Sequence, residues 1–418
     1  MPAAMTARSP IRPERLLGRL EAFARIGATP AGGVNRQTLS QEDRAARATL
    51  AGLAQARGFR VTQDGMANLF LRREGLDPAL PPVLIGSHLD SQPTGGRYDG
   101  ALGVLSAFET IEAMADADLA LPRAVEVVAW TNEEGSRYAP GAMGSMAFAG
   151  RADPSAWRER LDENGMRLGE ELDHTLASLA IAAPRPLGFP IAAYIELHIE
   201  QGPVLEREHI PIGIVTGIQG VRWLEVRLEG QAAHAGTTPP SFRRDPLAAA
   251  ATAIHRLGET LMPMEDEARF TVGRLQVVPG SINAIPQAVT FSVDLRHPDT
   301  GRLAKLDEAV RAEIAAAVAK KGCTARIESL LDMAPCRFPA AMIEVIEAAA
   351  RRVGAPARRL LSGAYHDALF VSDVAPTAMI FVPSRDGLSH NEAEFTEPDD
   401  IVTGARVLYE ATRALASA

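Results

Sequence analysis

The spacing of apolar residues predicts helices near both ends of the chain. In residues 15–26, leucine and phenylalanine side chains recur along one face of a helix. Residues 40–57 start with the sequence SQED, in which Ser40 is expected to cap the first turn. Apolar stretches over residues 101–115 and 340–352 predict two further helices, of the kind that cover a sheet.

Three short apolar runs predict buried strands. Residues 83–86, 125–130 and 191–199 are apolar at successive positions, and polar residues follow each run. A strand that is covered on both faces has this pattern, which is typical of the sheets of α/β proteins. We therefore expect an α/β domain whose sheet is buried between helices.

The hydrophobic pattern changes near residues 213–220. Beyond them, in residues 224–228 and 291–295, apolar and polar side chains alternate. Alternation of this kind indicates an antiparallel sheet with one exposed face. Residues 245–257 and 303–321 have helical patterns and are expected to accompany that sheet.

These patterns together predict two domains. A catalytic α/β domain is expected over residues 1–213 and 331–418, with a smaller α+β domain inserted over residues 214–330. Two prolines and a change in polarity over residues 332–339 predict the linker by which the chain returns to the first domain.

Composition limits the classes of function. The 418 residues carry a formal net charge of −9, which argues against nucleic-acid binding and, more weakly, against anionic membranes. No apolar run is long enough to span a bilayer, and the first residues do not read as a secretory signal. Cys323 and Cys336 are the only cysteines, so we expect a cytoplasmic protein without a disulfide scaffold.

Candidate chemistry follows the predicted strands. Acids and histidines stand mostly just after strand ends, where α/β sheets place their sites. They occur in the segments GSHLDSQPTGGRYDG (86–100), WTNEEGSRYAPGAMGS (130–145), YIELHIEQGP (194–203), GSINAIPQ (280–287) and GLSHNEAEF (387–395).

The first segment contains a possible ligand pair. His88 and Asp90 are two residues apart, so on a strand they point to the same side. The Asp90 carboxylate can then accept the second ring N–H of a metal-bound His88, and Asp99 can bridge two cations. The alternative is that Asp90 is a turn residue and that Asp99 caps a helix.

The second segment contains two adjacent acids, Glu133 and Glu134. Like charges at this spacing repel one another unless a cation or a shared proton intervenes. One of them can ligate a metal while the other takes a proton from water. A solvated acidic turn is the plain alternative.

The remaining segments supply His198, Asn283 and His390, each with an ordinary alternative: a core histidine, a turn residue and a surface histidine. Three histidines with two or three carboxylates suit two divalent ions, zinc first, with manganese, cobalt or nickel as alternatives. Such ions lower the pKa of water and polarise a carbonyl or urea oxygen. The set therefore indicates metal-assisted hydrolysis of a C–N bond.

The motifs resemble those of a known family, the M20-type metallo-aminoacylases and peptidases, and within it the hydantoinase/carbamoylase branch. That branch includes N-carbamoyl-L-amino-acid hydrolases, β-ureidopropionases and allantoate amidohydrolases. The resemblance runs from residue 10 to residue 415 and rests on GSHLDS, GGRYDG, NEEGSR, ELHIEQG, AAHAGTTP, GSINAIP, VDLRHPD and SHNEAEF. It implies a mixed-sheet, dinuclear metallo-aminopeptidase-like catalytic domain with an inserted ferredoxin-like domain that serves as lid and dimer interface.

The resemblance also implies roles for the candidate residues. His88, Asp99 and His198 would hold one metal ion, and Asp99 would bridge to a second ion. Glu134 and His390 would complete the second site. Glu133 would be the general base. Asp90 would be the partner of the His88 ring.

Substrate residues are implied in both domains. Gln201 and the backbone of Gly363 belong to the catalytic domain. His234, Asn283 and Arg296 belong to the inserted domain, through which a homodimer is expected to form. His234 is expected to stabilise the oxyanion, often from the partner subunit, and Arg296 to grip the substrate's carboxylate.

One position departs from the family pattern. The segment SGAYHDA (362–368) resembles a substrate loop that usually reads SGAGHDA, so Tyr365 stands where the family has glycine. The larger side chain is expected to narrow the pocket or redirect a subsite, which puts inherited substrate specificity in doubt.

The leading hypothesis is hydrolysis of an N-carbamoyl-L-amino acid to the amino acid, CO2 and ammonia. Allantoate hydrolysis, with the same ureido chemistry, is the first alternative, and hydrolysis of N-acyl amino acids or dipeptides is the second. A non-catalytic binder of small molecules is the alternative from another class. In each case the expected ligand is a small, mostly anionic ureido or amide compound.

Overall fold

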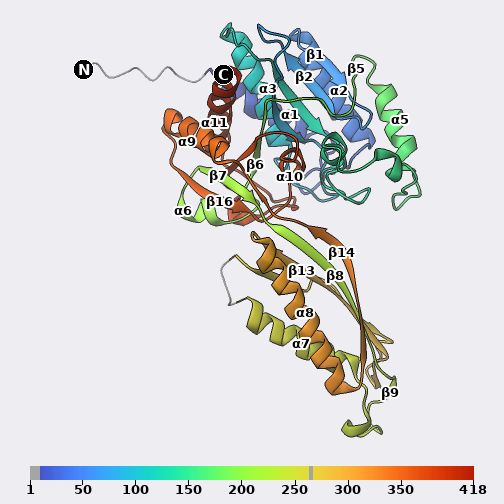
Figure 1. Cartoon of the computed structure of the whole chain (residues 1–418). Helices are drawn as coiled ribbons and strands as arrows, with labels where there is room; N and C mark the ends of the chain where they lie inside the picture. The colour runs from blue at the N-terminus through green and yellow to red at the C-terminus, as the bar shows by residue number, and fades with distance from the viewer. Residues whose placement is uncertain (1–9, 263–266) are drawn as a thin grey trace. The chain divides into compact units, whose positions relative to one another are not determined.

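The structure is a computed structural model that describes residues 10–262 and 267–418 (Figure 1). Contacts within the chain divide it into two compact units. Unit 1 extends to Thr216 and resumes at Phe338, and unit 2 is Gly217–Arg337. Unit 2 ends later than the predicted insert, residues 214–330, because strands extend to Arg337 where a linker was expected.

Unit 1 is built on a mixed sheet with four parallel strands at its centre. These are β17 (Thr377–Val382), β6 (Ala193–Ile199), β3 (Val83–His88) and β4 (Val125–Trp130), in that order. Every residue of the four strands is buried, and for β3, β4 and β6 this confirms the prediction of strands covered on both faces. Antiparallel or short strands flank the centre: β7 (Ile212–Ile218), β16 (Ala357–Ser362), β2 (Leu69–Arg73), β1 (Arg60–Gln63) and β5 (Ala183–Pro184).

Helices α3 (Ala101–Asp116), α9 (Ala340–Val353) and α11 (Pro398–Ala416) pack against the parallel strands, and α2 (Gln41–Ala56) packs against β1 and β2 (Figure 1). The predicted cap is confirmed, because the Ser40 hydroxyl accepts a hydrogen bond from the main-chain N–H of Asp43. The other helices of unit 1 are α1 (Pro13–Ala24), α4 (Met143–Phe148), α5 (Leu168–Ser178), α6 (Val204–Glu208) and α10 (Asp367–Val371), with short 3-10 turns η1 (Pro154–Trp157) and η3 (Arg385–Gly387).

Within residues 10–262 and 267–418, every helix is too short or too polar to cross a membrane.

Unit 2 is an α+β unit with a ferredoxin-like strand order. Strands β10 (Arg269–Thr271), β13 (Ala288–His297), β8 (Gly220–Glu229) and β14 (Thr324–Met333) form an antiparallel sheet in that order. Its remaining elements are α7 (Pro246–Leu261), α8 (Thr300–Lys321), β11 (Leu275–Val278), β9 (Ala233–His234), β12 (Ala284–Ile285) and η2 (Pro240–Phe242).

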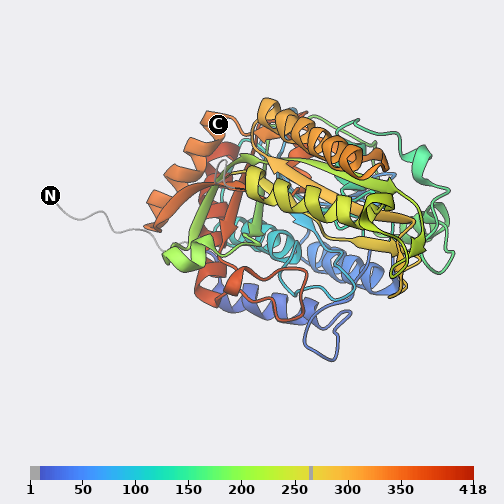
Figure 2. The same ribbon diagram turned by 90° about the horizontal axis from the view of Figure 1, so that it is seen from below.

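Helices α7 and α8 lie against one face of the unit 2 sheet (Figure 2). Apolar side chains from alternate strand positions pack against them. On β8, Leu224, Val226 and Leu228 are buried, whereas Trp223 and Arg227 are exposed. The alternation that predicted a half-exposed antiparallel sheet is therefore confirmed. The chain passes between the units on neighbouring strands, because Cys336 of β15 (Cys336–Arg337) pairs with Ile218 of β7.

A buried ion pair joins α2 to the loops at the end of the unit 1 sheet. The side chains of Arg47 and Asp43 are 2% and 0% exposed, with Nε of Arg47 2.9 Å from the carboxylate. The same guanidinium donates to the main-chain oxygen of Ala67 at 2.6 Å and to that of Trp130 at 3.4 Å. Arg47 thus fixes the turn before β2 and the carboxyl end of β4.

We expect Arg47→Met to lower the free energy of unfolding by about 3–5 kcal/mol, because it leaves the Asp43 carboxylate buried without its cation. Arg25→Met removes an exposed pair with Glu21 and serves as the control, with an expected loss of less than about 1 kcal/mol. Urea unfolding followed by circular dichroism measures both values. Equal losses in the two variants would show that Arg47 does not hold these loops.

Candidate metal centre

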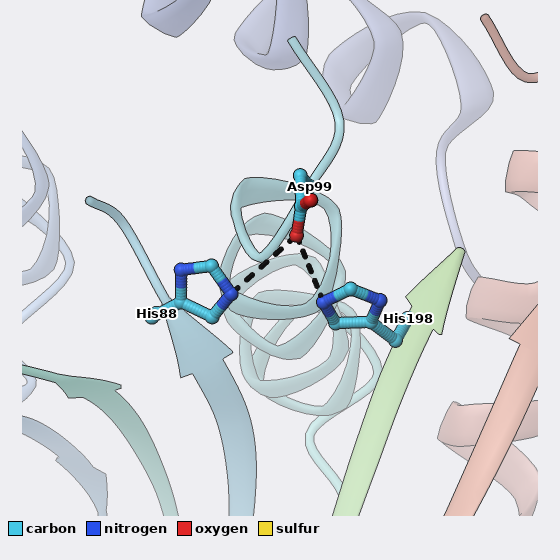
Figure 3. Close-up of side chains that lie close together, drawn as sticks. All are labelled: His88, Asp99 and His198. Carbon is cyan, nitrogen blue, oxygen red and sulfur yellow. Dashed lines mark ion pairs between the residues drawn. The ribbon is translucent and has the colours of Figure 1, made fainter. Parts of the chain in front are cut away.

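The carboxyl ends of the parallel strands bring the predicted ligands together. His88 is the last residue of β3, His198 lies near the end of β6, and Asp99 stands just before α3. Figure 3 shows both histidine rings directed at the Asp99 carboxylate. Parallel strands that end at one edge of a sheet are the reason that residues so far apart in the sequence converge.

The first ligand group comprises His88, Asp99 and His198, all buried. Nε2 of His88 lies 3.5 Å and Nε2 of His198 lies 3.1 Å from Oδ1 of Asp99. The other ring nitrogens, Nδ1, lie 2.9 Å from the main-chain oxygen of Asp90 and 3.0 Å from that of Ile199. A proton on each Nδ1 satisfies these carbonyls and leaves both Nε2 atoms as acceptors that can face a cation, although the main-chain N–H of Gly100 lies 3.3 Å from Nε2 of His198.

The position of Asp90 corrects one expectation. Its carboxylate was predicted to hold the His88 ring, but its main-chain oxygen does so, and the carboxylate Oδ1 is 3.8 Å from Nδ1. The carboxylate instead accepts hydrogen bonds from the main-chain N–H groups of Glu133, at 3.3 Å, and Glu134, at 3.2 Å. Asp90 therefore orients the acidic pair, because a carboxylate bound to two successive amides fixes the turn that carries them.

The second ligand group comprises Asp99, Glu134 and His390. Nε2 of His390 is 3.6 Å from Oδ2 of Asp99 and 3.3 Å from Oε2 of Glu134. Asp99 thus presents Oδ1 to the first group and Oδ2 to the second. Within each group the ligand atoms lie within 4.8 Å of one another. A carboxylate shared in this way is the arrangement that bridges two cations.

Electrostatics at the site favour a cation. Burial, together with neighbouring carboxylates, raises the pKa of Glu133 and of Glu134 well above the ordinary range. Burial opposes protonation of His88, but the carboxylates around it outweigh burial and raise the pKa of its imidazole. Nε2 of His88 is buried and has no hydrogen-bond partner in the described part of the chain. This concentration of buried negative charge with a lone imidazole nitrogen fits divalent metal ions, for which carboxylate and imidazole are ordinary ligands.

Glu133 lies beside both ligand groups without belonging to either. The Oε2 atom of Glu133 is 3.6 Å from Nε2 of His88, and Glu133 is 6% exposed. Asp367, which is fully buried, adds a further negative charge that raises the pKa of Glu133. A carboxylate with a raised pKa at this place can accept a proton and return it.

Three residues that sequence reasoning did not single out support the ligands. Glu394 accepts hydrogen bonds from the main-chain N–H groups of Tyr98 and Asp99, and burial and the Asp99 charge raise its pKa to about 8. Ser389 donates to Oδ2 of Asp99 at 2.9 Å, and Gln92 donates to Oε2 of Glu134 at 2.7 Å. Ser389 and Glu394 lie close in sequence to His390, and Gln92 lies close to Asp90. This proximity is the sequence signal that could have indicated their supporting roles.

A third cluster, Glu196, His198 and His366, also has ligand-like spacing. Its carboxylate already accepts hydrogen bonds from the Ser87 hydroxyl at 2.6 Å and from the main-chain N–H of Ala368 at 2.9 Å. Burial and the nearby histidines keep the pKa of His366 well below its usual value. The satisfied carboxylate makes this cluster a support for the His198 ring.

Two predicted substrate residues lie in unit 1. Gln201 donates from Nε2 to Oδ2 of Asp99 and to Oγ of Ser389, each at 3.0 Å, and its Oε1 is buried without a partner in the described residues. Gly363 is exposed in the turn between β16 and α10, where an added Cβ would contact nothing. Gln201 therefore lies beside the candidate metal ligands, and its Oε1 atom is an acceptor without a partner among the described residues.

The other three predicted substrate residues lie in unit 2. His234 on β9 pairs with Ala284 of β12, next to Asn283, and its ring is exposed. Arg296 is next to the last residue of β13, at the end of this strand that lies away from β12. It forms an ion pair with Asp294 at 2.8 Å. A substrate carboxylate would have to share or replace that partner, so the role expected for Arg296 stays a prediction, as do those of His234 and Asn283.

The chain matches a peptidase family and is similar to proteins that are named as hydrolases. Residues 84–414 match the model of peptidase family M20/M25/M40. The N-carbamoyl-L-amino-acid amidohydrolase of Pseudomonas sp. (strain NS671) is 39% identical over 96% of this chain and 97% of its own. The allantoate amidohydrolase of Bacillus subtilis is 34% identical over 93% and 94%. The crystal structure of a hydantoinase/carbamoylase family amidase from Burkholderia multivorans superposes with a TM-score of 0.93 at 42% identity, covering 99% of this chain and 100% of that one.

Removal of the shared carboxylate tests the metal centre. We expect Asp99→Asn to weaken zinc binding by at least about 100-fold, because ligand and charge are lost together. Metal content after chelation, reloading and desalting measures this, and the zinc-induced rise in melting temperature should shrink in parallel. His255→Ala, on the exposed surface of α7, is the control and should bind zinc like the unmodified protein. Normal zinc content in Asp99→Asn would contradict the assignment.

Proposed function

The chain belongs to peptidase family M20/M25/M40, and from this premise we propose that it hydrolyses the ureido C–N bond of an N-carbamoyl-L-amino acid to give the amino acid, CO2 and ammonia. The observation that carries the proposal is the Asp99 carboxylate shared between two ligand groups, with Glu133 beside both. The identity of 39% with an N-carbamoyl-L-amino-acid amidohydrolase over nearly the whole chain supports the choice of substrate class.

Two divalent ions, zinc first, are proposed at this site. His88, Asp99 and His198 would hold one, and Asp99, Glu134 and His390 the other. When bound, the ions lower the pKa of water and polarise the ureido carbonyl. Ser389 and Glu394 hold Asp99 in the orientation that presents one oxygen to each group.

Glu133 is proposed to move the proton. It takes a proton from the attacking water and delivers it to the amino-acid nitrogen, which leaves the ureido carbon; the carbamic acid that remains breaks down to CO2 and ammonia. Its position 3.6 Å from the His88 ring and its raised pKa suit both halves of that task. Asp90 holds the main chain of Glu133, which keeps the carboxylate aimed at the reacting atoms.

Substrate recognition is proposed to use both units. Oε1 of Gln201, which lacks a partner within the described residues, suits an N–H of the ureido group. The backbone of Gly363 and the side chain of Asn283 would bind polar groups of the substrate. Arg296 suits its carboxylate, and His234 suits the oxygen that becomes negative.

The spacing within unit 2 supports a homodimer. His234 and Asn283 lie near the Ala288 end of β13, whereas Arg296 lies at the His297 end. Eight strand positions separate Ala288 from Arg296, which corresponds to about 26 Å. That span exceeds the length of a carbamoyl amino acid, so both ends can serve one substrate only if they come from different copies of the chain.

Allantoate is the second candidate substrate. It carries the same ureido group, and the 34% identity with an allantoate amidohydrolase favours it specifically. Rates on allantoate and on several carbamoyl amino acids separate the two candidates. A preference for N-acyl amino acids or dipeptides over all ureido compounds would instead support ordinary amide hydrolysis.

Glu133→Gln is expected to lower kcat for the best ureido substrate by at least about 100-fold, because the amide cannot carry the proton. Zinc content and melting temperature should stay near those of the unmodified enzyme, since Glu133 is outside both ligand groups. Ammonia release, measured with zinc-, manganese- or cobalt-loaded protein, gives the rates. Loss of zinc along with activity would make Glu133 a ligand, and unmodified protein that releases no ammonia from any ureido substrate would contradict the proposed function.

Mixing two inactive variants tests the dimer. If His234 acts on the partner's centre, Glu133→Gln and His234→Ala subunits form a mixed dimer with one complete site. Equal amounts, after subunit exchange, should then recover about a quarter of the unmodified activity, as expected for random pairing of a two-fold dimer. Glu133→Gln mixed with Glu133→Gln/His234→Ala is the control and should stay inactive. No recovery in a mixture shown by light scattering to be dimeric would place His234 in its own subunit's site.

A further inference from the structure

Tyr365 extends from the loop between β16 and α10 to the turn that carries the proposed base. The phenol hydroxyl donates to the main-chain oxygen of Glu133 at 3.4 Å. It lies directly over Gly141, where even a Cβ atom would overlap the phenol oxygen. The ring thus fills a space that the turn leaves open only because residue 141 has no side chain.

The loop that carries Tyr365 is held at several points. The Ser362 hydroxyl donates to the main-chain oxygen of Ala364 at 2.8 Å and lies 3.0 Å from Nε2 of His366. The His366 ring in turn packs edge-on against the His198 ring, with ring centroids 4.5 Å apart. A side chain anchored on such a loop at one end and on the Glu133 turn at the other cannot easily move aside.

The electrostatic surroundings place the phenol beside the reacting groups. Burial raises the pKa of Tyr365, and the carboxylates of Glu133, Glu134 and Asp90 raise it further. The phenol therefore stays neutral at working pH, and its proton is engaged with the Glu133 carbonyl. Its main effect on a substrate is the volume of the ring.

The direction of proton transfer indicates which part of the substrate meets that ring. Under the proposed function, the bond that breaks joins the ureido carbon to the amino-acid nitrogen, and Glu133 delivers its proton to that nitrogen, which therefore lies next to Glu133. A substituent on the carbon next to that nitrogen would then lie near the Glu133 turn, against which Tyr365 packs. The side chain of the substrate is therefore the group that competes with the ring for space.

We propose that Tyr365 is a specificity-determining residue that restricts the enzyme to ureido acids with a small group, namely hydrogen, methyl or hydroxyl, on the carbon next to the ureido nitrogen. This inference rests on the proposed function and narrows it. Substrates with a benzyl side chain, or with a second ureido group as in allantoate, would have to displace a ring held at both ends. Overpacking of a filled site is costly, so they are disfavoured.

The test compares kcat/KM for N-carbamoylglycine, N-carbamoyl-L-alanine, N-carbamoyl-L-phenylalanine and allantoate in zinc-loaded protein. The unmodified enzyme should favour the two small substrates over the two large ones by about 10- to 100-fold, the range that a few atoms in a shaped pocket can discriminate. Tyr365→Gly removes the p-hydroxybenzyl group and should shift this ratio at least about tenfold toward the large substrates.

Tyr365→Phe is the matched control, because it keeps the ring and removes only the hydroxyl. It should retain the preference for small substrates. Melting temperature and zinc content show whether the variants are folded and loaded, and Tyr365→Ala replaces Tyr365→Gly if the glycine variant does not fold. The inference is overturned if the unmodified enzyme accepts N-carbamoyl-L-phenylalanine as well as N-carbamoylglycine, or if neither small variant changes the ratio. Absence of turnover on all four substrates is a separate result that removes the proposed function itself.

Discussion

Buried negative charge around Asp99 is the constraint on which the rest of the site depends. Asp99, Glu133 and Glu134 lie close together and out of water, and such groups cannot all be ionised without compensation. In the protein alone, protons compensate, which is why the pKa values of the glutamates and of His88 are raised. Bound cations would compensate in place of the protons, and under the proposed function this would leave Glu133 to exchange its proton. The proposed metal binding and the proposed base chemistry would thus have one electrostatic origin.

Main-chain contacts of the surrounding fold fix the positions of these charged side chains. Carbonyl groups at the strand ends fix the two histidine rings, and Asp90 holds the amides of the acidic pair. Arg47 in turn ties α2 to the main chain at Trp130, the last residue of β4. The position of each ligand therefore depends on the packing of unit 1 as a whole.

Much of this arrangement could be predicted from sequence, because it is encoded locally. Apolar runs predicted β3, β4 and β6, and a charged or imidazole side chain at each strand end indicated the site. The role of the Asp90 main-chain oxygen could not be predicted, since sequence patterns specify side chains and not which atom faces a ring. The support that Glu394 gives to Asp99 and the ion pair of Arg296 with Asp294 could not be predicted for a related reason. The hydrogen bond of Glu394 to Tyr98 joins residues 296 positions apart, and the pairing of Arg296 with Asp294 depends on the exposed face of one strand.

The pairing of Cys336 with Ile218 has a consequence for how such a protein can change. The chain leaves and re-enters unit 1 on adjacent strands, so the two ends of unit 2 are about one interstrand spacing, roughly 5 Å, apart. An insert with neighbouring ends can be deleted, exchanged or acquired by recombination without stretching its host, as is common for modules placed within a domain. The catalytic scaffold and its accessory module can therefore evolve at different rates.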